Sequence, residues 1–149
     1  MGEFLLAIAH HVVILAMAAI LVVELMVVRP QINATQVTRL RRLDGIYGSF
    51  IALILFIGIL RVSNGAKGQD FYTDNPLFWM KMVAFAAVGL LSVQPSIRIY
   101  SWSQQTQSGG FFSAPPDEVA RVRLFLWIEA GVFLTIPFFA VAAARGFGL

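Results

Sequence analysis

The sequence has no cysteine and few charged residues, and these two shortages exclude several classes of protein. Among its 149 residues there is no Cys, so disulfide scaffolds, thiolate metal sites, cysteine-ligated iron–sulfur clusters and covalently attached c-type haem are excluded. Charged residues make up 13% of the chain and hydrophobic residues 58%, with a mean hydropathy of +0.78. Soluble domains are about one-quarter charged and about half apolar. We therefore predict an integral membrane protein, with a single transmembrane domain over residues 1–149.

Two further absences narrow the function. There is no P-loop, nucleophile elbow, H-E-x-x-H or G-x-G-x-x-G motif, so the catalytic sites typical of soluble enzymes are not expected. The net charge is +3, but the eleven Lys and Arg residues are scattered around apolar blocks and gather on no single element. This distribution favours membrane topology over nucleic-acid binding.

Four apolar segments account for most of the chain, each close to the ~20 residues that cross a ~30 Å hydrocarbon core. They cover about residues 4–28, 43–60, 77–93 and 122–144. No strand-like alternation competes with them, so we predict an all-α, four-helix membrane bundle. We expect Pro95 to limit the third segment, and the Ser-, Gln-, Gly- and Pro-rich stretch 101–118 to form a flexible connector.

Arginines in the connections predict the orientation of the bundle. The first and third connections hold Arg29, Arg39, Arg41, Arg42, Arg98, Arg121 and Arg123. The second connection holds only Arg61 and Lys67, and the termini carry little charge. By the positive-inside rule, the first and third connections are cytoplasmic and both termini lie on the outer side.

Ionisable residues at membrane depth are costly, and each is therefore a functional candidate. His10 in the first span and Lys81 in the third lie at similar depths, roughly 6–9 Å below the outer boundary at ~1.5 Å per residue. Arg61 follows the second span in the same layer, and Trp79 stands nearby at the interface. We predict that His10, Lys81, Arg61 and Trp79 form an outer polar site.

Helical periodicity selects His10 over its neighbour His11. Glu24 should avoid lipid, and His10 lies within about 40° of it at ~100° per residue. His11 lies about 140° away from Glu24 on the same wheel. We therefore expect His10, Met17 and Glu24 to share an interior stripe.

Glu24 and Glu129 form a predicted second polar layer, near the cytoplasmic side. Arg41, Arg98 and Arg123, accompanied by Asp44, are positioned to neutralise them. One interpretation is a set of ion pairs that hold helix ends together. The other is a proton path from the cytoplasm to the outer site.

The outer layer offers the side chains that b-type haem (heme b) uses. Histidine is a common axial ligand, and arginine suits the haem propionates. His10 would be the metal ligand, Arg61 a propionate partner, and Lys81 a second ligand or catalytic proton acceptor. Zinc is disfavoured because no His/Asp/Glu cluster has ligand spacing. Aromatic and Met side chains line any membrane bundle, so a purely structural role for His10 as an interhelical hydrogen-bond partner stays open.

Motifs along most of the chain resemble those of a known family. They are Leu40-Arg41-Arg42-Leu43-Asp44-Gly45-Ile46-Tyr47-Gly48, Gly65-Ala66-Lys67-Gly68, Phe71-Tyr72, Asn75-Pro76-Leu77-Phe78-Trp79-Met80-Lys81, Val88-Gly89-Leu90-Leu91-Ser92, Pro95 and Ala144-Arg145-Gly146. The family is the predicted bacterial membrane proteins catalogued as domain of unknown function 2214. The resemblance implies a multi-pass protein of the bacterial inner (cytoplasmic) membrane and brings no assigned activity. In that membrane, the outer side that the positive-inside rule gives to both termini is the periplasm.

The layout is also similar to that of HemJ-type protoporphyrinogen oxidases. These are small four-span proteins in which a histidine early in span one and a lysine in a motif opening span three are linked to haem binding and activity. By position, His10 would match that histidine and Lys81 that lysine, and the opening of the fourth span, with Arg123 and Glu129, looks similar. The end of the first span differs, because that family has an inward aromatic residue and a Pro-Arg ending, whereas this chain has Glu24 and Arg29-Pro30. The resemblance implies a porphyrin site and an oxidoreductase of the protoporphyrinogen oxidase type.

We therefore predict a membrane protein that binds haem b and has a redox role, either electron transfer or porphyrinogen oxidation. The alternative is a non-catalytic helical accessory subunit of a larger membrane complex or a homo-oligomer. Small residues such as Ala16, Ala19, Ala84 and Ala87 would then permit close helix contact. Transport is disfavoured because four spans without broken helices leave little room for alternating access. The lipid bilayer is the expected surrounding, and nucleic acid is not an expected partner.

Overall fold

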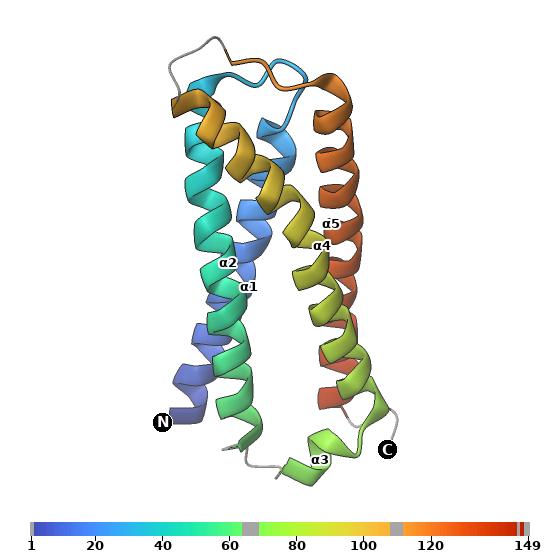
Figure 1. Ribbon diagram of the computed structural model, residues 1–149. Helices are drawn as coiled ribbons and strands as arrows, with labels where there is room; N and C mark the ends of the chain where they lie inside the picture. The colour runs from blue at the N-terminus through green and yellow to red at the C-terminus, as the bar shows by residue number, and fades with distance from the viewer. Residues whose placement is uncertain (1, 64–68, 108–111, 146, 148–149) are drawn as a thin grey trace.

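The computed structural model describes residues 2–63, 69–107, 112–145 and 147, and this part of the chain is helical with short connections (Figure 1). The helices are α1 (Gly2–Val27), α2 (Ala34–Ser63), α3 (Gln69–Thr73), α4 (Pro76–Gln107) and α5 (Pro116–Ala144). All but α3 are long and apolar enough to cross a membrane. The predicted all-α architecture with four spans is therefore confirmed.

The four long helices pack as two antiparallel pairs, α1 with α2 and α4 with α5. Further contacts join α2 to α4 and α1 to α5. Both chain termini and α3 lie at one end of the bundle, which we call the terminal end (Figure 1). The opposite end, which we call the connection end, carries the α1–α2 link at residues 28–33 and the segment 112–115 before α5.

Local capping explains where two of the helices begin. Asn33 Oδ1 accepts the Gln36 N–H at 2.9 Å, and Gln36 Oε1 accepts the Asn33 N–H at 3.0 Å. This reciprocal pair is a capping box at the start of α2. At α4, Asn75 Oδ1 accepts the Leu77 N–H at 2.9 Å. Pro76 follows as the first helical residue, where its missing N–H costs nothing.

Three helices extend further than the apolar segments predict. α2 begins at Ala34 rather than near residue 43, and α5 begins at Pro116 rather than near residue 122. α4 runs through Pro95 to Gln107, so the expectations that Pro95 limits the helix and that 101–118 is a connector throughout are wrong. A proline removes one backbone hydrogen bond, and a transmembrane helix can absorb that loss when neighbouring helices support it. Residues 108–111 and the 65–68 motif with Lys67 lie outside the described residues.

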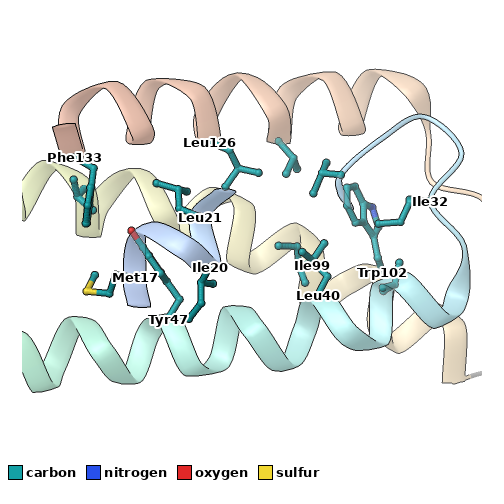
Figure 2. Packing of buried hydrophobic residues seen from close by; sticks show 14 of the residues in the cluster. Met17, Ile20, Leu21, Ile32, Leu40, Tyr47, Ile99, Trp102, Leu126 and Phe133 are labelled. Carbon is teal, nitrogen blue, oxygen red and sulfur yellow. The ribbon is translucent and has the colours of Figure 1, made fainter. Parts of the chain in front are cut away.

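The helix extensions exist because they share a core at the connection end. Trp102 of α4 is fully buried there, together with Ile32, Leu40 and Ile99 (Figure 2). The Trp102 indole N–H donates to Glu118 Oε2 at 2.9 Å. An amphipathic helix outside the lipid is stabilised by packing one apolar face, which a search for continuous apolar runs does not detect.

Candidate functional site

A cavity of about 220 Å³ lies between α1, α2, α4 and α5, in the half of the bundle near the terminal end. Its lining is mostly aliphatic, aromatic and methionine side chains. The lining residues are His10, Ile14, Met17, Ile54, Leu55, Gly58, Ile59, Val62, Ser63, Phe78, Lys81, Met82, Phe85, Phe133, Ile136 and Pro137. His10 and Lys81 are thus two of very few polar groups in an apolar chamber.

His10 enters this cavity from α1 beside Gly58 of α2. A Cβ at position 58 would lie 3.9 Å from His10 Cε1, an ordinary van der Waals distance, so the imidazole lies next to this part of α2. His10 Nδ1 is shielded from solvent and has no hydrogen-bond partner in the described part of the chain. His11 is exposed, and its Nδ1 lies 2.7 Å from the Ala7 carbonyl oxygen. The two histidines therefore diverge as helical periodicity predicts.

The two predicted cationic residues gather around His10. Lys81 reaches the cavity from α4, and its Nζ lies 4.6 Å from the centroid of the Phe78 ring. Arg61, near the end of α2, is outside the lining but close enough to interact electrostatically with both His10 and Lys81. Residues from three helices, far apart in sequence, therefore meet in one polar cluster.

Trp79 is not part of this cluster. Its side chain is 55% exposed and does not line the cavity. The indole N–H donates to the Thr73 carbonyl oxygen at 2.9 Å, which ties the start of α4 to the end of α3. An interfacial tryptophan that anchors a helix end is common in membrane proteins.

A second polar layer lies further along the bundle, in its interior. Glu24 is 3% exposed and Glu129 is 1% exposed. The Tyr47 hydroxyl donates to Glu129 Oε1 at 2.6 Å, whereas Glu129 Oε2 and Glu24 Oε1 have no partner among the described residues. Glu129 lies one helical turn from Phe133, which lines the cavity. Glu129 therefore lies close to the apolar α5 wall of the cavity.

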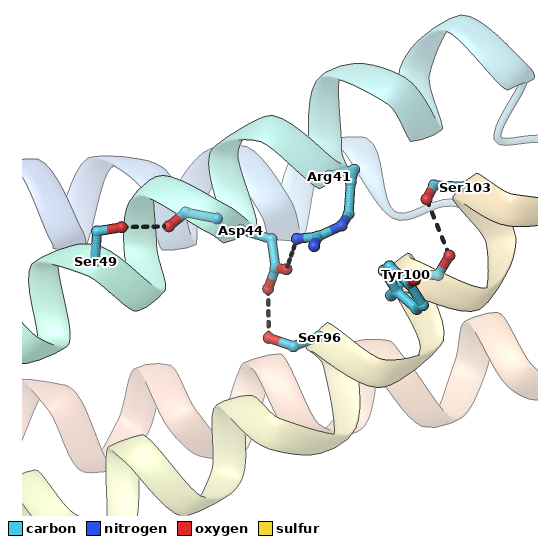
Figure 3. A network of polar contacts seen from close by, with 7 residues as sticks. Arg41, Asp44, Ser49, Ser96, Tyr100 and Ser103 are labelled. Atoms are coloured by element: carbon cyan, nitrogen blue, oxygen red, sulfur yellow. Dashed lines mark hydrogen bonds and ion pairs between the residues drawn. The ribbon is translucent and has the colours of Figure 1, made fainter.

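The expectation that arginines neutralise Glu24 and Glu129 is wrong. Arg41 pairs with Asp44 at 3.2 Å, and Asp44 also accepts a hydrogen bond from the Ser96 hydroxyl (Figure 3). Arg98 pairs with Glu118 at 3.2 Å.

Arg123 instead donates to the carbonyl oxygens of Leu25 and Val28, at 3.2 and 2.6 Å. Carbonyl oxygens at the end of a helix lack backbone partners within it, so those of Leu25 and Val28 are free to accept from this guanidinium. The arginines thus satisfy groups at the connection end, beyond the buried glutamates.

Two buried polar residues were not predicted as site residues. Tyr47 is the hydrogen-bond partner of Glu129, and Val37, Leu40, Asp44 and Tyr47 recur at the three- and four-residue spacing of one buried helix face. That spacing was the sequence signal that could have placed Tyr47 in the interior. Asn75 is also buried, and its Nδ2 donates to the Phe147 carbonyl oxygen at 3.2 Å. The Asn-Pro pair signals the cap but not this link to the C-terminal segment.

Comparison with known families finds one whose description is "Predicted membrane protein (DUF2214)", and its model matches residues 2–148. No curated protein and no solved structure matches the chain.

Proposed function

The chain belongs to this family of predicted membrane proteins (DUF2214), and from that premise we propose that it binds haem b in the cavity between its four long helices and has a redox role. One observation carries the proposal. His10 and Lys81, from α1 and α4, converge on a chamber that is otherwise almost wholly apolar, and His10 Nδ1 is buried without a partner. Ionisable residues placed at membrane depth are costly, which argues for a functional role.

The residues present fit a haem by their chemistry. A single imidazole can serve as its axial ligand, whereas a group of three or more His, Cys, Asp or Glu side chains able to hold a bare metal ion is not found in the described part of the chain. The enclosed volume is below the ~300 Å³ of small-molecule pockets. The lining, however, includes Leu55 and Ile59, whose side chains are exposed at the outside of the bundle. The cofactor space is therefore open on one side.

Each residue of the cluster has a distinct role in this proposal. His10 would hold the iron, and Lys81 would either be a second ligand or accept a proton at Nζ. Arg61 would provide the counter-charge for a propionate, because guanidinium pairs well with carboxylate. Phe78 and Phe133 are buried side chains of the lining and would give the porphyrin ring apolar contacts. Bound haem would supply a one-electron redox centre, in electron transfer or in porphyrinogen oxidation.

We also propose that the terminal end faces the periplasm across the bacterial inner membrane. The connection end carries most of the basic residues of the chain. At the terminal end, the sequence has Arg61 near the end of α2, Lys67 between α2 and α3, and Arg145 directly after α5. By the positive-inside rule, the end with more Lys and Arg residues is cytoplasmic, so the terminal end is placed outside.

Absorbance spectroscopy tests the haem proposal. The protein would be purified in mild detergent, supplied with haemin, and compared before and after dithionite reduction. A Soret band that is lost in His10→Ala and kept in His11→Ala is the expected result. A featureless spectrum would instead favour the alternative, a non-catalytic accessory subunit of a larger membrane complex.

A further inference from the structure

A second hollow, separate from the cavity at His10, runs between α1 and α5 with a volume of about 390 Å³. The side chains that line it come from α1 (Ala18, Leu21, Val22, Leu25 and Met26), from Arg29 just after the end of α1, and from α5 (Arg123, Trp127, Ala130, Phe133 and Leu134). This spacing places each set on one helix face. We call this hollow the α1–α5 groove. Because the two helices are antiparallel, both arginines lie at its connection end.

The charge of the groove is concentrated at that end. The rest of the lining is apolar, and Arg29 is exposed. In the described residues, ion pairs join Arg41 to Asp44 and Arg98 to Glu118, and neither Arg29 nor Arg123 takes part in one. Arg123 is fixed in place by the α1 carbonyls that it donates to, which are neutral and leave its positive charge uncompensated. Two guanidinium groups therefore attract an anion at one end of an apolar groove.

The length of the groove matches one leaflet of a bilayer. On α5, eleven residue steps separate Arg123 from Leu134, which corresponds to ~16 Å along an α-helix. Half of a ~30 Å hydrocarbon core is ~15 Å. Trp127 lies one turn beyond Arg123 and is 60% exposed. A tryptophan next to arginines is typical of the headgroup level.

We propose that the α1–α5 groove binds one anionic phospholipid, with its phosphodiester at Arg29 and Arg123 and an acyl chain along the apolar wall. Guanidinium groups bind phosphate oxygens in a fork geometry, which explains why arginine rather than lysine stands at both positions. A zwitterionic lipid brings the same phosphate together with a cation that the two arginines repel. The groove therefore selects lipids with a net negative headgroup.

Native mass spectrometry of the delipidated protein in detergent tests this proposal. Phosphatidylglycerol and phosphatidylcholine with identical acyl chains would be titrated separately. We expect phosphatidylglycerol to bind more tightly, and Arg29→Gln to weaken it by on the order of fivefold, the effect of one basic residue near an anionic lipid surface. Arg42→Gln is the matched control, because Arg42 is also exposed and lies near the same end but outside the groove.

A second variant tests the acyl-chain half of the proposal. Ala130 lines the groove on α5 and is only partly buried, so Ala130→Phe reduces the space available to an acyl chain, and circular dichroism checks that the fold is kept. We expect this variant to weaken both lipids. Equal binding of the two lipids by the unmodified protein, an equal loss in Arg29→Gln and Arg42→Gln, or unchanged binding in Ala130→Phe would each overturn the assignment. None of these outcomes depends on whether haem is bound.

Discussion

The hydrogen bond between Tyr47 and Glu129 offers a quantitative test of the buried polar layer. Tyr47→Phe removes one hydroxyl and nothing else from a residue that is almost wholly buried. The Glu129 side chain, itself 1% exposed, then loses the 2.6 Å bond to Oε1, while Oε2 already has no partner among the described residues. The variant therefore leaves a buried carboxyl without a donor from this network.

Two ranges bear on the size of this effect. Hydrogen bonds between membrane helices average only ~0.6 kcal/mol and reach ~1.7 kcal/mol. Leaving a buried polar group unsatisfied costs about 1–3 kcal/mol. Because this bond is short, buried and has no substitute on the same carboxyl, the upper part of the first range applies. We expect Tyr47→Phe to lower the free energy of unfolding by about 1–2 kcal/mol.

Reversible unfolding in mixed micelles measures this change. Tyr100→Phe is the matched control, because Tyr100 is exposed and keeps its ring beneath Arg41; surface changes stay within about 0.5 kcal/mol. Combining Tyr47→Phe with Glu129→Leu completes a double-mutant cycle. A coupling energy near zero, or equal effects of the two Tyr→Phe variants, would refute the reasoning.

Three further predictions concern the connection end and the orientation. Trp102→Ala should lower the free energy of unfolding by about 3–5 kcal/mol, the range for large buried aromatics, because Trp102 is fully buried and loses its bond to Glu118; near-native stability of Trp102→Ala in the same micelle assay would contradict this. Asn33→Ala removes the capping box of α2 and should cost ~1 kcal/mol, seen as a lower Tm, whereas an unchanged Tm would argue against the cap. Because the chain has no Cys, Thr35→Cys and Asp74→Cys each carry a single exposed thiol, at opposite ends of the bundle. In intact cells a membrane-impermeant maleimide should label Asp74→Cys and not Thr35→Cys, and the reverse pattern would invert the proposed orientation.

Hydropathy and helical periodicity predict the parts of this fold that depend on lipid. Long apolar runs identify all four spans, because a helix is the simplest way to satisfy backbone groups in hydrocarbon. The fixed rotation per residue separates His10, at the cavity, from His11, which is exposed. The first and third spans run parallel, so residues near their starts lie at similar depths. His10 and Lys81 could therefore be placed in one layer from the sequence alone. These inferences need no knowledge of side-chain partners.

The parts that depend on which side chains and carbonyls contact one another were harder to predict. The segment from Ala34 onward is helical because Val37 and Leu40 face a shared core, but the arginines between and after them give the segment the composition of a loop. Arg123 and Glu129 both lie in the predicted cytoplasmic half of the fourth span, and this shared depth suggested an ion pair. The unsatisfied carbonyls at the end of α1 bind it instead, and only the packing of α5 against α1 brings them within reach.

Haem binding at His10 is best tested by the reduced-minus-oxidised spectrum of the purified protein and its two histidine variants. We expect a b-type haem signal, with a Soret band and reduced α and β bands, in the unmodified protein and in His11→Ala. His10→Ala should lose that signal while keeping its helical content by circular dichroism. Full haem retention in His10→Ala, or no haem binding by the unmodified protein even with added haemin, would contradict the proposal.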